Sequence, residues 1–344
     1  MNPYTESIRL AWENHNRDLV RGYNHVNVNR DKLDEFAANL ATKDFELPSW
    51  RAPVFPQDDD ENFLRFIFVA NSINYCFTDF KTGMKFDMEY PEGVLWQGSF
   101  AMTACLKRAV DNGMPILNPA FLKEITLPEV EVIFVHKDTR IPMKESRLQQ
   151  LRLLGEDMQR NGFNDFADVF KTSDYYVWRE SGDCILKILE KFQSYEDFRI
   201  YEDLETRKAC VLKFQKRAQL LAMIYHGRAV SSKGKLQPIR DPESIGPISD
   251  YQVPNALRGP DVGVLEYSKD LTRRIAEGKE IKENSIVEVS IRAKTVEVMQ
   301  ELLLLINWLR PQDKQITMAE LDYYIWRVGR KSGMLHHYTY TTAY

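Results

Sequence analysis

The segments KACVLKFQKRAQLLAMIYHGR (residues 208–228) and ISDYQVPNALRGPDVGVLEYSKDL (residues 248–271) decide how the rest of the chain is interpreted. The first predicts a buried helix, because its apolar residues recur every three to four positions. One stripe consists of Val211, Phe214, Ala218, Leu221 and Tyr225. A second stripe, about 100° further round the helix, consists of Leu212, Lys216, Gln219 and Met223. Lys216 and Gln219 are therefore expected within an apolar arc.

A lysine in such a position needs a partner, because burial removes its hydration. The second segment offers Asp250, which lies in a Ser249-Asp250-Tyr251 turn. Two interpretations follow. In the first, Asp250 caps a short helix that begins near Tyr251 and Lys216 extends to the surface. In the second, Lys216 and Asp250 form a functional site. The spacing alone favours the first, since caps and surface lysines are much commoner than sites.

Composition limits the class of protein. The chain has 344 residues, 44% of them hydrophobic, which predicts one compact unit or two lobes that share a cleft. Lys and Arg number 46 against 50 acidic residues, giving a formal charge of −4. Proteins that grip long nucleic acid are usually basic, so this balance predicts no such partner but allows a single nucleotide in a local pocket.

Four cysteines, Cys76, Cys105, Cys184 and Cys210, show no paired spacing, so we expect no zinc site, no other metal and no disulfide framework. The first residues, MNPYTESIRLAWENH, do not resemble a signal peptide. The longest apolar run, residues 302–309, is too short to span a bilayer. A cytoplasmic protein without a membrane partner or a cofactor is expected.

Periodicity and turn residues predict a mainly α protein with a compact, multi-helix, bundle-like fold. Besides residues 208–228, the predicted helices are 3–22, 30–41, 63–77, 97–112, 146–161, 163–170, 183–192, 294–309 and 318–330. Residues 63–77 also have the composition of a strand, but their length favours a helix. A small β-hairpin is expected from residues 84–90 and 94–96, and a brief strand at 286–291. Residues 48–60 form a connector and 231–248 a long loop.

Several motifs, taken in order, resemble the queuosine salvage family of queuosine 5′-phosphate N-glycosylases. Around the two opening segments they are Lys216-Arg217-Ala218-Gln219, Asp250-Tyr251-Gln252-Val253-Pro254, Gly263-Val264-Leu265 and Tyr267-Ser268. Elsewhere they are Asn74-Tyr75-Cys76-Phe77, residues 96–108, Ile141-Pro142-Met143 with Arg147, Ser194-Tyr195-Glu196-Asp197, Asp322-Tyr323-Tyr324-Ile325-Trp326 and His337. The resemblance extends from about Asp60 to Tyr344. It implies a DNA-glycosylase-like helical domain over residues 61–344, preceded by N-terminal helices and a connector over residues 1–60.

The resemblance also implies an activity. Members of the family hydrolyse the N-glycosidic bond of queuosine 5′-monophosphate and release queuine, which is salvaged for tRNA modification, and ribose 5-phosphate. Such a bond breaks through an oxocarbenium-like sugar, which a carboxylate stabilises and to which water must be delivered. Asp250 matches the family's catalytic aspartate, and the neighbouring Tyr251 is expected to orient it. Lys216 matches a pocket lysine that either binds the phosphate or keeps Asp250 ionised.

The remaining candidate residues are assigned to the substrate. Arg147 and His337 are candidates for the 5′-phosphate, with a surface ion pair and a solvated tail as the ordinary alternatives. Tyr75, Phe77 and Trp96 are candidate walls for the flat base, although such aromatics commonly belong to a core. Asp197 matches a family aspartate that would hold the base's aminomethyl cation, or it begins a turn. Gln219 is a further polar candidate.

Two positions differ from the family's usual pattern. Thr78-Asp79 follows Phe77 where family members carry an aromatic residue, and Ile248-Ser249-Asp250-Tyr251-Gln252 replaces Phe-Ala-Asp-Tyr-Arg. Two alternatives therefore stay open. One is an N-glycosylase that acts on a different nucleoside 5′-monophosphate. The other is a non-catalytic helical interaction protein in which Lys216 and Asp250 form a structural pair.

Overall fold

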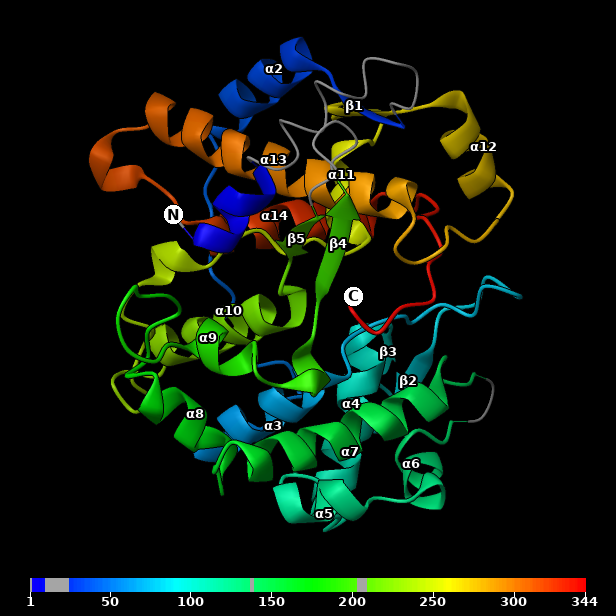
Figure 1. The fold of residues 1–344 in the computed structure, drawn as a ribbon, viewed down its shortest axis with the longest axis vertical. Helices are drawn as coiled ribbons and strands as arrows, with labels where there is room; N and C mark the ends of the chain where they lie inside the picture. The colour runs from blue at the N-terminus through cyan, green and yellow to red at the C-terminus, as the bar shows by residue number, and fades with distance from the viewer. Residues whose placement is uncertain (1, 10–24, 137–138, 203–208) are drawn as a thin grey trace. The chain divides into compact units, whose positions relative to one another are not determined.

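A computed structural model describes residues 2–9, 25–136, 139–202 and 209–344 (Figure 1). Helices dominate these residues, and the strands form short antiparallel pairs, β1 with β6, β2 with β3 and β4 with β5. The predicted mainly α fold with a small hairpin is confirmed. In the described part of the chain, no helix has both the length and the apolar character that a membrane crossing requires.

The chain divides into two compact units, each assembled from segments that are distant in sequence. The first contains Met1–Leu47, Asp197–Lys216 and Pro242–Thr339. The second contains Pro48–Glu196, Arg217–Asp241 and Tyr340–Tyr344. The domain boundary expected near residue 60 stays a prediction.

The first unit is built around one long helix, α13 (Ile286–Leu309). Its other elements are β1 (Val26–Val28), α2 (Arg30–Leu40), β4 (Phe198–Glu202), β5 (Ala209–Lys213), α11 (Gln252–Leu257), β6 (Leu265–Tyr267), α12 (Lys269–Ala276) and α14 (Met318–Lys331). Helix α13 packs against α2, β1, α11 and α14. The helices predicted at 30–41 and 318–330 are therefore confirmed. Of the helix predicted at 3–22, residues 3–9 are helical and residues 10–22 lie outside the described residues.

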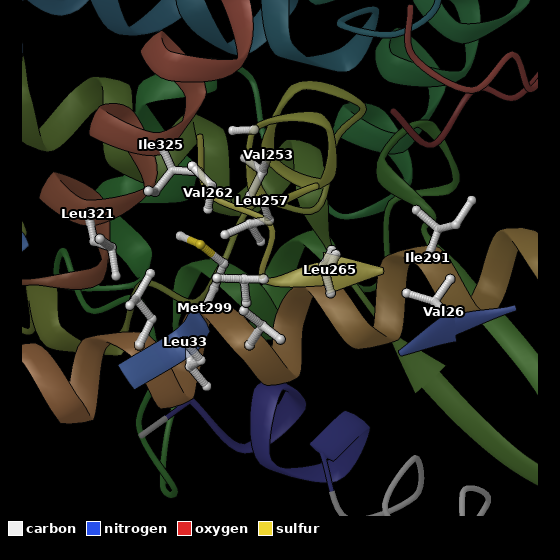
Figure 2. Close-up of a cluster of buried hydrophobic side chains, with 14 of the residues drawn as sticks. Val26, Leu33, Val253, Leu257, Val262, Leu265, Ile291, Met299, Leu321 and Ile325 are labelled. Carbon is white, nitrogen blue, oxygen red and sulfur yellow. The ribbon is translucent and has the colours of Figure 1, made fainter. Parts of the chain in front are cut away.

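The core of the first unit lies along α13 (Figure 2). Leu33 of α2, Val26 of β1 and Leu265 of β6 pack together with Ile291 and Met299 of α13. The same cluster contains residues of two further helices, Val253 and Leu257 of α11 and Leu321 and Ile325 of α14. Val262 is the remaining residue labelled in Figure 2. This core fixes α11 and α14, the two helices on which the site described below is built.

The strand predicted at residues 286–291 is wrong, because these residues form the beginning of α13. Ser285 caps the helix by accepting the Glu288 N–H at 3.3 Å. Residues from Val287 to Gln300 are buried on every side of the helix. Polar and apolar residues therefore do not segregate onto opposite faces, and the V-E-V-S-I sequence imitates the alternation of a strand.

The helix predicted from residue 208 begins only at Lys216, where α10 (Lys216–Ser231) starts. Residues 209–213 instead form strand β5, which pairs with β4 so that Val211 lies opposite Ile200. Val211 is 48% exposed whereas Leu212 is buried, which is the alternation of a strand. Gln215 has a φ of 53° and redirects the chain between the strand and the helix. The apolar stripe assigned to Val211 and Phe214 was therefore wrong.

The second unit contains the helices between the connector and residue 196, together with most of α10. They are α3 (Glu61–Ser72), α4 (Ser99–Asp111), α5 (Pro119–Glu124), α6 (Leu127–Ile133), α7 (Lys144–Arg160), α8 (Phe166–Thr172) and α9 (Ile185–Leu189), with the hairpin strands β2 (Asp87–Glu89) and β3 (Leu95–Gln97). The predicted helices at 63–77, 97–112, 146–161, 163–170 and 183–192 are confirmed in type, and so is the hairpin. Apart from the 3-10 helix Pro242–Ser244, residues 232–248 contain no helix or strand, as predicted.

Candidate active site

Asp250 lies at the start of α11, in a turn held by backbone hydrogen bonds. Its Oδ1 accepts the N–H of Gln252 at 2.7 Å and the N–H of Val253 at 3.1 Å. These are groups that have no partner inside the helix, so Asp250 acts as a cap. The predicted capping role is confirmed. It also fixes one carboxylate oxygen and leaves the side chain only partly buried.

Lys216, the first residue of α10, is 3% exposed, so the interpretation that it extends to the surface is wrong. Gln219, one turn later, is 2% exposed. The predicted burial of both polar side chains is therefore confirmed. The positive charge of Lys216 acts on the Asp250 carboxyl, whose pKa it lowers. Lys216 and Asp250, which the sequence suggested as partners, therefore interact electrostatically in the structure.

Asp197 fixes the turn that leads into Lys216. Its carboxylate is fully buried and receives two hydrogen bonds from Arg292 of α13, at 2.7 and 2.8 Å. Its Oδ2 also accepts the Lys216 N–H at 2.9 Å. Burial alone would raise the pKa of Asp197, but Arg292 outweighs it and the pKa lies below its usual value. The carboxylate is therefore ionised and engaged by Arg292, an arrangement that favours the positioning of Lys216 over the predicted contact with a base cation.

Helix α14 approaches the Asp250 turn with three residues. Asp322 accepts the N–H of Ile248 through Oδ2 at 2.8 Å, and Trp326 hydrogen-bonds the Asp250 carboxylate with its side chain. Gly329 packs so closely that a Cβ atom there would lie 2.2 Å from the Gln252 carbonyl oxygen. The sequence had singled out Asp322 and Trp326 as a motif without giving them a role. Their separation by four residues, which places both on one face of a helix, was the signal.

The electrostatics of this cluster are set by burial and by one lysine. Burial raises the pKa of the Asp250 carboxyl, while Lys216, the two backbone N–H groups and Trp326 act in the opposite direction. Burial also raises the pKa of Asp322, further increased by the charge of Asp250 and opposed by the Ile248 N–H and Lys216. A raised pKa makes Asp250 a better proton acceptor than a solvated aspartate.

The predicted residues Tyr251 and His337 belong to the same unit as Asp250. Tyr251 is 7% exposed and stacks on His336, with ring centroids 4.6 Å apart. His337 meets the Tyr251 ring edge-on at 6.0 Å and is 2% exposed. Burial and the nearby positive charges of His336, Arg258 and Arg292 lower the pKa of His337 to about 3. A neutral imidazole gives a phosphate no charge, so the structure weakens that assignment for His337.

The other predicted residues, Tyr75, Phe77, Trp96, Arg147 and Gln219, belong to the second unit. Arg147 is fully buried and donates to the carbonyl groups of Ile73, Tyr75, Cys76 and Pro142. Its guanidinium carbon also lies 4.5 Å from the centre of the Tyr75 ring and 5.3 Å from that of Phe77. These partners favour a structural role for Arg147 over the predicted phosphate contact.

Trp96, a candidate wall for the base, is held by its own hairpin and by α4. Its indole N–H donates to the Tyr90 carbonyl at 2.8 Å, and its ring stacks on Phe100 at 5.7 Å. Tyr75 is fully buried, whereas Trp96 and Phe77 are partly exposed. The base-binding roles of Tyr75, Phe77, Trp96 and Gln219 stay predictions.

The geometry around Asp250 suits a reaction in which positive charge develops on carbon. The carboxylate has one oxygen fixed by two backbone donors, a pKa raised by burial and a lysine within electrostatic range. It can stabilise a cation and take a proton from water. Among the described residues, no group of three or more His, Cys, Asp or Glu side chains is arranged to hold a metal ion.

Comparison with known proteins identifies the same family as the sequence motifs. The model of the queuosine salvage protein family matches residues 54–344. A relative from Sphaerobacter thermophilus is 27% identical, over 95% of this chain and 96% of its own length. Relatives from Mus musculus and Schizosaccharomyces pombe are 28% and 24% identical, over 95% and 88% of this chain and 92% and 83% of their own lengths.

All three relatives carry the name queuosine 5′-phosphate N-glycosylase/hydrolase. The family model covers most of the chain, including Lys216, Asp250 and Asp322. The resemblance expected from the motifs is thereby confirmed. This chain belongs to the queuosine salvage protein family.

Proposed function

We propose that this protein hydrolyses the N-glycosidic bond of queuosine 5′-monophosphate and releases queuine and ribose 5-phosphate. Membership of the queuosine salvage family and the names of the relatives support the substrate. The observation that carries the chemistry is Asp250, a carboxylate held by the N–H groups of Gln252 and Val253 and by Trp326, with Lys216 close enough to lower its pKa.

In this reaction the bond between the sugar C1′ and the base nitrogen breaks, and the bonding electrons leave with the base. The ionised Asp250 stabilises the positive charge that develops on the sugar. Water then adds to C1′ and its proton passes to Asp250. In sum, one water molecule is divided between the sugar, which gains OH, and the base, which gains H, and Asp250 returns to its ionised form. Lys216 favours the ionised form of Asp250 at the start of each cycle, and a contact with the phosphate stays its alternative role.

The first prediction is that Asp250→Asn abolishes turnover without unfolding the protein. Asparagine caps helices about as well as aspartate, so the free energy of unfolding should change by less than about 1 kcal/mol. The loss of the carboxylate should lower kcat by about 10²- to 10⁴-fold. Release of queuine from queuosine 5′-monophosphate, followed by mass spectrometry, measures activity, and thermal melting measures stability.

Asp60→Asn is a matched control, because Asp60 caps α3 in the same way. Its Oδ1 accepts the N–H groups of Asn62 and Phe63 at 2.9 and 3.4 Å. This variant should retain full activity. If native protein releases no queuine while an active relative does, the proposed function is wrong. A strong loss of stability in Asp250→Asn, of about 3–5 kcal/mol, would instead indicate the structural pair expected of an interaction protein.

A second candidate is the same reaction on another nucleoside 5′-monophosphate. The motivation is Thr78, which stands where the family resemblance implies an aromatic residue, and which is 4% exposed. A panel of nucleoside 5′-monophosphates assayed under identical conditions separates the two candidates. Faster turnover of any other member of the panel would favour the second. The expected cytoplasmic location and the absence of membrane and long nucleic-acid partners stay predictions.

A further inference from the structure

Asp322 lies beside the proposed catalytic carboxylate, and the mechanism above does not use it. It is on α14, is 2% exposed, and its Oδ2 accepts the Ile248 N–H at 2.8 Å. Ile248 comes two residues before Asp250. A buried carboxyl therefore anchors the backbone that leads directly into Asp250.

The contacts of α14 follow the turn in regular steps. Asp322 bonds Ile248, Trp326 bonds Asp250, and Gly329 packs against the Gln252 carbonyl. Steps of four and three residues along the helix match steps of two residues along the turn, because residues spaced by three or four lie on one face of a helix. The Ser249 hydroxyl adds a bond to the Arg292 carbonyl of α13 at 3.3 Å. The turn is thus fixed from two helices.

The charges of the cluster favour the ionisation of only one of its two carboxyls. The charged groups that act most strongly on Asp322 are the Asp250 carboxyl, which raises its pKa, and the Lys216 ammonium, which lowers it. Like charges at close range disfavour the second ionisation, as in other carboxyl pairs. Asp322 is the more deeply buried of the two. Its single N–H donor does not offset burial, so its pKa lies well above the usual value.

We propose that Asp322 is a positioning residue that keeps its proton during turnover, anchors the Asp250 turn through Ile248 and leaves Asp250 as the single ionised carboxylate of the cluster. This inference rests on the proposed glycosylase function. An ionised Asp322 would compete with Asp250 for Lys216 and favour protonation of Asp250. A protonated Asp322 avoids both effects while it still accepts the Ile248 N–H.

Asp322→Asn and Asp322→Ala together test this role. The asparagine oxygen can accept the same N–H, and the amide cannot ionise. We expect kcat of Asp322→Asn to stay within about threefold of native near neutral pH, and kcat of Asp322→Ala to fall by about 10-fold or more because the turn is released. A decline of native kcat at alkaline pH, where Asp322 loses its proton, should be absent from Asp322→Asn.

Asp157→Asn is the control for loss of a buried carboxyl elsewhere. Asp157 is on α7, is fully buried and accepts the Ser194 N–H at 2.8 Å, and burial raises its pKa. This variant should keep the native pH profile of kcat. The proposal is overturned if Asp322→Asn is as inactive as Asp322→Ala, because an ionised carboxylate is then required. The same alkaline behaviour in native protein and Asp322→Asn also overturns it.

Stability gives a readout that does not depend on activity. The pKa of Asp322 is raised by folding, so native protein loses stability as the pH rises from the unfolded value of about 4 through the folded value. Asp322→Asn lacks this loss. The melting temperature of Asp322→Asn, measured relative to that of native protein, should therefore increase as the pH rises. A constant difference would overturn the proposal even if native protein proved inactive, whereas inactive native protein with the expected difference would refute only the proposed function.

Discussion

At the scale of single residues, a small number of neighbouring groups sets the ionisation of Asp250. Lys216, two backbone donors and the Trp326 side chain favour its ionised form, and burial opposes them. The sequence could identify Asp250 and Lys216, because a family motif and an apolar arc single them out. It could not show that Asp197 is engaged by Arg292, since the two residues are 95 positions apart and only folding pairs them.

A prediction for Trp326 follows from its bond to Asp250. Trp326→Phe keeps an aromatic ring but removes the N–H donor, so the pKa of Asp250 should rise. The acid limb of the pH profile of kcat should move to higher pH, because Asp250 must be ionised to act. Trp308→Phe is the control, since Trp308 is 82% exposed on α13. An unchanged acid limb in Trp326→Phe would show that another group controls it.

At the scale of elements, most helices could be predicted and two segments could not. Helices with one apolar face, such as α14, have the 3.6-residue pattern that the sequence shows plainly. The start of α13 is buried all round and therefore lacks that pattern. Strand β5 was missed because its pairing with β4 depends on a partner that no local pattern reveals, and because apolar residues continue without a break into α10.

The contact between α11 and α14 gives a prediction at this scale. A Cβ atom at Gly329 would lie 2.2 Å from the Gln252 carbonyl oxygen, so Gly329→Ala must push the helices apart. We expect a loss of about 1–3 kcal/mol in the free energy of unfolding. The displaced Trp326 should also reduce kcat by about 10- to 100-fold.

Gly333→Ala separates this effect from ordinary backbone strain. Gly333 has a φ of 64°, and no atom lies within 4 Å of the place that an added Cβ atom would occupy, so alanine there is strained but not crowded. It should lower stability by about 1–2 kcal/mol and leave kcat unchanged. Equal losses of kcat in both variants would contradict the role given to the α11–α14 contact.

At the scale of the whole molecule, stability in acid should depend on His337. Folding lowers its pKa from 6.5 to about 3, so the unfolded chain binds one more proton than the folded protein between these values. Stability due to this group is complete above pH 6.5 and is lost as the pH falls toward 3.

The corresponding prediction is that His337→Gln makes stability less dependent on pH in this window. A single extra proton contributes a slope of about 1.4 kcal/mol per pH unit, which the variant should lack. Chemical denaturation at several pH values measures the slope. Identical slopes for native protein and His337→Gln would show that His337 is not buried as a neutral side chain.

The regularly spaced contacts between α14 and the Asp250 turn also restrict where residues can be inserted into this chain. One residue inserted between Asp322 and Trp326 would rotate everything after it by about 100° and translate it by about 1.5 Å. Trp326 and Gly329 would then point away from the turn while Asp322 kept its place. Lengthening should therefore be tolerated in residues 232–248, which contain little regular structure, and excluded from the helix between Asp322 and Gly329, which makes about two turns.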